Sequence, residues 1–68
     1  MNAIVEAAKL QEEYRRLLTG GKLTKKALCA LCIPFRDKYG LTDKDTLRIA
    51  RKEVEMMELV QMLHLMEG

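Results

Sequence analysis

Residues 41–68 read LTDKDTLRIARKEVEMMELVQMLHLMEG, and most of what the sequence says about the fold lies in this segment. Thr42 is a suitable helix N-cap, and Asp43 and Asp45 place negative charge in the first turn, where the helix dipole favours it. No Gly or Pro interrupts residues 43–67, and Leu, Met, Glu, Lys and Arg are good helix formers. The pattern therefore predicts one long helix over residues 43–67.

The second half of this expected helix is apolar on nearly every side. With a step of about 100° per residue, the first half has one apolar side, whereas the second half has apolar side chains in most directions. A helix that is apolar all round is either buried or bound to a partner. We expect a protein interface formed by Met56, Met57, Leu59, Val60, Met62, Leu63 and Met66.

A chain of 68 residues offers little interior for such a helix. We expect one helical domain over residues 1–68, and a domain of this size buries only about 60% of its unfolded surface. The last helix would span roughly 37 Å and the first about 25 Å. The part of the last helix that extends beyond the first would need cover from another chain. This favours a homodimer or higher oligomer, arranged as a dimeric helical bundle joined by the last helix. The alternative is that the first helix folds back and covers the far end within one chain.

Two shorter helices are expected before this segment, over residues 2–18 and 24–39. The first has apolar residues at helical spacing and is followed by Gly20 and Gly21, and glycine is common at helix ends. We interpret its apolar face as core. That face contains Ala3, Ala7, Leu10, Tyr14, Leu17 and Leu18, with Ile4 at its edge.

Pro34 lies inside the second expected helix. Proline lacks a backbone donor and clashes with the carbonyl four residues earlier, here that of Ala30, so we expect a kink or a split. Gly40 then ends the helix, and no segment shows the period-two alternation of a strand. The expected fold class is all-α, a three-helix domain with a kinked middle helix and a long C-terminal helix.

Cys29 and Cys32 form a Cys-x-x-Cys pair, but a redox pair usually lies at a helix N-terminus after a strand. With His64 they supply at most three metal ligands, whereas a closed zinc site needs four. Two copies of the chain would reach four ligands by combining their cysteine pairs. We interpret the cysteines as small buried apolar residues and expect no metal and no cofactor. His64 is a titratable group for an interface, or simply half-exposed on its helix.

No pattern for catalysis is found in the sequence. Gly20 and Gly21 precede Lys22, but without a preceding strand they do not make a phosphate-binding loop. No nucleophile with a paired base can be named, so we do not expect an enzyme. The net charge of +2 and the 32% of charged residues indicate a mixed surface. The absence of a signal peptide or a membrane span leads us to expect a cytoplasmic protein with reduced cysteines.

A basic ridge on the last expected helix supports a different function. Residues spaced by four lie on one helix face, and a short turn at Gly40 precedes this helix, an arrangement typical of a helix-turn-helix. Asp43 and Asp45 oppose nucleic-acid binding, because they lie where phosphates would approach. The expected nucleic-acid contacts are Lys44, Arg48, Arg51 and Lys52.

We expect a small non-catalytic regulatory or adapter protein that binds another protein through an apolar helical surface. Methionine side chains are flexible and suit recognition of a partner helix. The expected partners are a second copy of the chain and another protein, with no membrane. The alternative is a small DNA-binding transcriptional regulator that dimerises through the same last helix.

Overall fold

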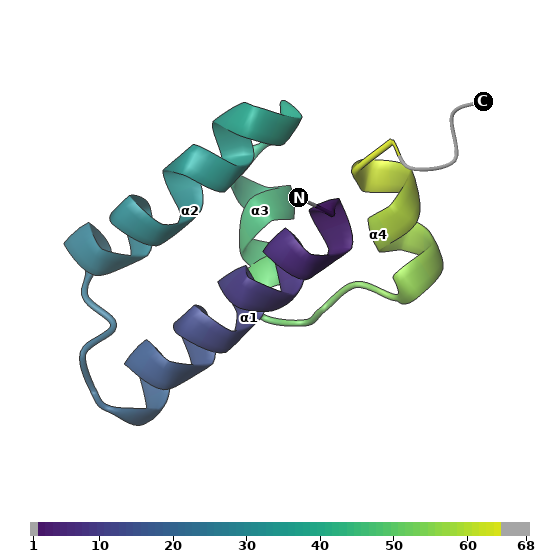
Figure 1. The fold of residues 1–68 in the computed structure, drawn as a ribbon. Coiled ribbons are helices and arrows are strands. Elements are labelled where there is room, and N and C mark those ends of the chain that lie inside the picture. The colour runs from purple at the N-terminus through teal and green to yellow at the C-terminus, as the bar shows by residue number, and fades with distance from the viewer. Residues whose placement is uncertain (1, 65–68) are drawn as a thin grey trace.

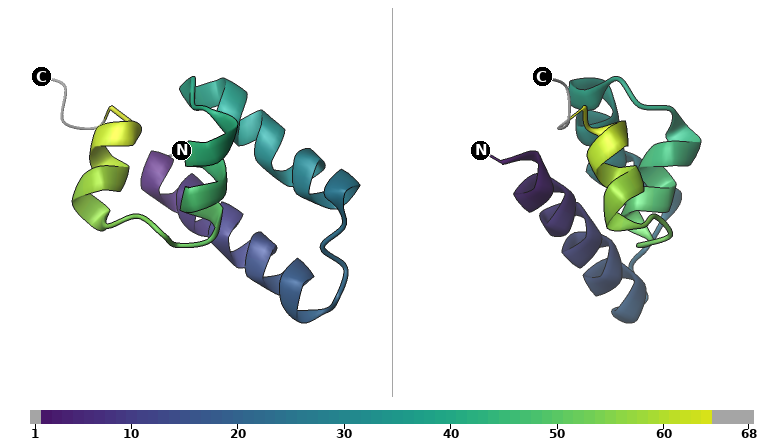
Figure 2. Two further views of the ribbon diagram at one scale, coloured as in Figure 1. Left: turned by 180° about the vertical axis from the view of Figure 1, so that it is seen from behind. Right: turned by 90° about the vertical axis from the view of Figure 1, so that its right-hand side faces the viewer.

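The computed structural model describes residues 2–64, which form a small all-helical structure (Figure 1). Helices α1 and α2 lie side by side and antiparallel, and α3 packs against both of them. Helix α4 lies beside the N-terminal end of α1 (Figure 2). The helices are α1 (Ala3–Thr19), α2 (Lys25–Tyr39), α3 (Asp43–Ala50) and α4 (Met56–Met62).

Side-chain caps begin the first three helices. Asn2 Oδ1 accepts a hydrogen bond of 2.7 Å from the Ile4 N–H at the start of α1. The hydroxyls of Thr24 and Thr42 accept from backbone N–H groups three residues later, each at 3.1 Å. Because a cap satisfies a donor that has no partner within its helix, these residues set where α1, α2 and α3 begin. The prediction that Thr42 is an N-cap is confirmed.

Helix α2 runs from Lys25 to Tyr39 with Pro34 inside it, so the helix is not split. Pro34 and Ala30 are both exposed. Proline donates no hydrogen bond to the carbonyl of Ala30, four residues earlier. The kink expected at Pro34 stays a prediction.

The prediction of one long helix over residues 43–67 is wrong for its described part, because the chain turns between α3 and α4. Lys52 adopts the left-handed conformation with φ of 58°. Its N–H donates to the Ile49 carbonyl at 3.0 Å, and the Glu53 N–H donates to the Arg48 carbonyl at 2.8 Å. These two bonds form a Schellman motif, a frequent way to end a helix. Glycine usually holds the left-handed position, and a lysine there does not predict a helix end.

The turn at Lys52 brings α4 back onto the rest of the chain. Leu59 and Leu63 become part of the same core as α1, α2 and α3, with only 5% and 4% of their surface exposed. The overhanging apolar helix that argued for a second copy is therefore absent from residues 2–64. The core consists of Ala3, Ala7, Leu10, Tyr14, Phe35, Ile49, Ala50, Leu59 and Leu63.

Glu6 of α1 is hydrogen-bonded to the last two residues of α2. Its carboxylate accepts from Lys38 Nζ at 2.6 Å and from the Tyr39 hydroxyl. These two bonds lower the pKa of Glu6. The hydrogen bond that the Tyr39 hydroxyl donates to Glu6 raises the pKa of Tyr39. Between residues 2 and 64, no helix is long and apolar enough to cross a membrane.

Candidate interaction surface

Helix α4 has an inner side in the core and an outer side in solvent. Leu59 and Leu63 form the inner side, whereas Met56 and Met57 are each 61% exposed. We call Met56 and Met57 the methionine face. Val60 and Met62 are half-buried between the two sides, and Met66 lies outside the described residues. Of the interface predicted from the sequence, the structure thus leaves the methionine face most accessible.

A groove with a volume of about 370 Å³ separates the start of α1 from α4. We call it the α1–α4 groove. Met56 is one of the residues that line it, so the groove adjoins the methionine face. Its lining residues are Ile4, Ala8, Gln11, Lys52, Val54, Met56 and Leu59.

A second hollow of about 750 Å³ continues along α1 toward its C-terminal end. It shares Ala8, Gln11 and Lys52 with the α1–α4 groove, so the two hollows adjoin each other. Five of the α1 residues that line the two hollows follow helical spacing, but polar side chains among them mask this stripe in the sequence. They are Ile4, Ala8, Gln11, Arg15 and Leu18, and Glu12 and Tyr14 also line the larger hollow.

The predicted basic ridge is not continuous. Lys52 lies beyond the end of α3, so it does not extend the helical row formed by Lys44 and Arg48. Arg48 is half-buried and makes ion pairs with Glu58 at 2.9 Å and with Asp45 at 3.6 Å. Because carboxylates already neutralise Arg48, it offers less charge to a phosphate than the sequence pattern suggested.

Arg51 lies at the C-cap of α3 and contacts α1. Its Nε–H donates to the phenolic oxygen of Tyr14 at 3.1 Å, and this bond raises the pKa of Arg51. This contact could not be predicted from the sequence, because 37 residues separate the two side chains. Among the predicted nucleic-acid contacts, Lys44, Arg51 and Lys52 are exposed.

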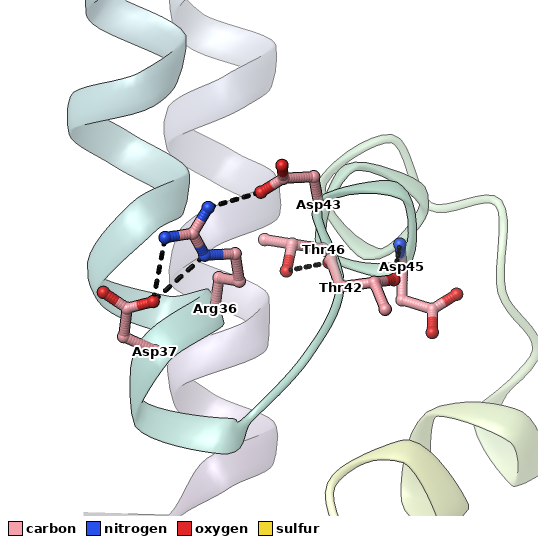
Figure 3. Close-up of polar contacts among 6 residues, drawn as sticks. All are labelled: Arg36, Asp37, Thr42, Asp43, Asp45 and Thr46. Atoms are coloured by element: carbon pink, nitrogen blue, oxygen red, sulfur yellow. Dashed lines mark hydrogen bonds and ion pairs between the residues drawn. The ribbon is translucent and has the colours of Figure 1, made fainter.

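The turn between α2 and α3 is held by charged side chains (Figure 3). Arg36 bonds Asp43 across the turn at 2.5 Å and Asp37 on its own helix at 3.0 Å. These carboxylates raise the pKa of Arg36, and the hydrogen bond that Arg36 donates to Asp43 is the main cause. Thr46, which is buried, donates from its hydroxyl to the Thr42 carbonyl at 2.9 Å. The turn is therefore fixed at both of its ends.

The two cysteines line a smaller groove between α2 and α3. Cys29 is exposed, so its interpretation as a buried residue is wrong, whereas Cys32 is half-buried. Burial is the main cause that raises the pKa of the Cys32 thiol, with a smaller effect from Cys29. A raised pKa favours the thiol over the nucleophilic thiolate, which speaks against a reactive pair. His64 is exposed.

Comparison with protein-family models, with curated proteins and with solved structures finds no significant match to this chain. The functional argument therefore rests on the surfaces described above. Of these, the methionine face with the α1–α4 groove combines exposed apolar side chains with a concave surface.

Proposed function

We propose that this chain is a small non-catalytic regulatory or adapter protein that binds another protein through the methionine face and the α1–α4 groove. The observation that carries this proposal is the exposure of Met56 and Met57, 61% each, with Met56 lining the groove. Single exposed apolar side chains are ordinary on protein surfaces. Two adjacent methionines at the edge of a groove lined by Ile4 and Val54 are a more specific feature.

A short amphipathic helix is the partner segment that this surface fits best. Its apolar side chain would enter the α1–α4 groove above Ala8 and contact Met56, whose flexible thioether adapts to different shapes. Lys52, which lines the same groove, would pair with a carboxylate at the edge of the partner. The partner would therefore combine one or two large apolar residues with an acidic residue.

Self-association as a dimeric helical bundle stays part of this proposal. Helix α4 is the element through which two copies would meet, because it carries the methionine face. In the chain described, Leu59 and Leu63 are already covered by their own chain. A second copy that docks on this form would therefore contact Met56 and Met57 rather than the buried leucines.

DNA binding remains the second candidate, supported by the short turn from Tyr39 to Asp43 that joins α2 to α3. The ion pairs of Arg48 and the acidic first turn of α3 weaken it. Its test is a salt series with duplex DNA, in which binding should fall steeply with salt and weaken in Lys44→Ala. Absence of binding at low salt would exclude this candidate.

The test of protein binding compares two surface variants of the full chain. Met57→Lys removes half of the methionine face, and Ile33→Lys is the matched control, because Ile33 is an exposed apolar residue on α2. Both sites are exposed, so both variants should fold, as circular dichroism would verify. Each chain is immobilised and incubated with extract of the source cell.

We expect the unchanged chain and the Ile33→Lys variant to retain equal amounts of a partner protein. The Met57→Lys variant should retain about tenfold less of it, or even less. In the complex, peroxide should oxidise Met56 and Met57 more slowly than in the free chain, as peptide mass spectrometry would show. Equal retention by Met57→Lys, with unchanged oxidation rates, would overturn the proposal.

A further inference from the structure

We propose that α4 is exchanged between two copies of this chain. In the exchanged dimer the turn at residues 51–55 straightens, residues 43–62 form one helix, and each α4 packs beside α1 of the other copy. The inference rests on the self-association included in the proposed function, and it states how that association occurs. Three observations carry it.

The first observation is the backbone of Lys52. Helices α1 and α3 end in the same Schellman motif, with Gly21 in the left-handed position after α1 and Lys52 in that position after α3. Glycine adopts this conformation at no steric cost, whereas the Cβ of lysine crowds the following carbonyl oxygen. The turn that folds α4 back therefore contains a local strain that a straight helix would relieve.

The second observation is the composition of the turn. Residues 51–55 read RKEVE, without Gly, Pro or Asn. Arg, Lys and Glu are good helix formers, and only Val54 is a moderate one. The local sequence therefore supports a continuous helix at least as well as a turn. Packing of α4 against the core is what favours the turn, and the same packing is available from a second copy.

The third observation is the core packing of Leu59 and Leu63, which a second copy could supply in the same way. Leu59 and Leu63 pack into a core that contains Ala3, Ala7 and Leu10 of α1, and a second copy presents the same residues. Exchange thus buries the same apolar surface without new side chains, which is the general basis of domain swapping. The place beside α1 holds α4 of the same chain, and α4 of a second copy carries the same side chains.

The ion pair between Arg48 and Glu58 distinguishes the two forms. In the folded-back chain its atoms lie 2.9 Å apart. In a straight helix these residues, ten positions apart, would be separated by about 15 Å, so the pair could form only between copies. A pair between Arg48 and Glu58 of one chain therefore indicates the folded-back form, and a pair between two chains indicates the exchanged dimer.

The experiment mixes two charge-reversed variants, Arg48→Glu and Glu58→Arg, one of them isotopically labelled. They are unfolded together in urea, refolded and weighed by native mass spectrometry. Only an exchanged dimer that contains one chain of each variant places opposite charges at both positions. The control is the double variant Arg48→Glu/Glu58→Arg, which restores the pair within one chain and between identical copies alike.

We expect mixed dimers to rise from the statistical half to more than about three quarters of all dimers, because each contains two restored pairs. The double variant mixed with a labelled copy of itself should give the statistical half. A dimer without preference for the mixed species would overturn exchange and leave the proposed function standing. Monomers alone, up to the solubility limit, would overturn both exchange and the self-association on which it rests, but not the binding of another protein.

A second pair of variants tests the strain at Lys52. Lys52→Gly relieves the left-handed conformation and weakens a straight helix, whereas Lys52→Ala keeps the steric cost and remains a good helix former. We expect Lys52→Gly to lower the dimeric fraction by about fivefold relative to Lys52→Ala at equal concentration. Equal dimeric fractions for the two variants would contradict the role of the turn.

Discussion

Arg51 donates a hydrogen bond of 3.1 Å from its Nε to the phenolic oxygen of Tyr14, and this contact connects the end of α3 to α1. Tyr14 belongs to the core, whereas Arg51 is exposed. Arg51 directly precedes Lys52, where the backbone enters the left-handed conformation. The bond therefore stabilises the point at which the chain turns back toward α4.

Removal of this acceptor in Tyr14→Phe should lower the stability of the chain while leaving its packing nearly unchanged. Phenylalanine keeps the buried ring but cannot accept the hydrogen bond from Arg51. Urea unfolding followed by circular dichroism measures the loss. A double-mutant cycle with Arg51→Ala should show that the two losses are not additive. Additive losses would mean that the contact contributes nothing.

The two sides of α4 should respond differently to truncation. Leu63→Ala removes a side chain that is 4% exposed and should cost about 2–5 kcal/mol in the free energy of unfolding. Met57→Ala changes an exposed side chain and should stay within about 0.5 kcal/mol. Both values come from urea unfolding of the full chain. Similar losses at the two positions would contradict the packing of α4 described above.

The contacts of Glu6 predict a pH dependence of stability. Bonds from Lys38 and Tyr39 lower the pKa of Glu6 below its ordinary value of 4.5. The resulting stabilisation is present above pH 4.5 and is lost as the pH falls through the lowered pKa. The raised pKa of Tyr39 works in the other direction, because its contribution is lost as the pH rises above the ordinary value of 10.

Glu6→Gln should therefore flatten the decline of the unfolding temperature at acid pH. Thermal scans at a series of pH values below 4.5 measure this decline in the variant and in the unchanged chain. Glu12→Gln is the matched control, since Glu12 is an exposed acid on the same helix. An equal decline in all three chains would show that Glu6 does not contribute.

Glycine in place of Lys52 should stabilise the folded-back chain. Lys52→Gly removes the steric cost of a φ of 58° and should raise the free energy of unfolding by about 1 kcal/mol. Glu53→Gly is the control, because no left-handed strain is relieved there and glycine only adds freedom to the unfolded chain. Thermal unfolding of the two variants, at a concentration low enough to keep the chain monomeric, measures the difference in their stability. A gain in Glu53→Gly alone would contradict this account.

Local signals were sufficient for the first part of the fold. Thr24 and Thr42 cap helices because their hydroxyls reach N–H groups three residues away, and Gly21 and Gly40 adopt the left-handed conformation that glycine favours. Four of the residues expected in the core of the first helix are buried: Ala3, Ala7, Leu10 and Tyr14. Leu18, expected with them, is exposed, since it lies at the end of α1.

The candidate interface could be predicted only in part. An apolar surface around Met56 and Leu63 was evident from the sequence, but periodicity does not tell which side of a helix its own chain covers. The structure exposes Met56 and buries Leu63. The groove beside Met56 could not be predicted, because it is formed by α1 and α4 together.

The sequence by itself determined that the chain is helical, where the first three helices begin, and that the last segment has an apolar surface. These properties follow from interactions among residues a few positions apart. Only the tertiary structure decided that Lys52 ends α3, that Leu59 and Leu63 return to the core, and that Arg48 pairs with Glu58. The burial of two leucines against distant residues outweighs the local preference of residues 51–55 for a helix, and contacts of this kind leave no pattern in the nearby sequence.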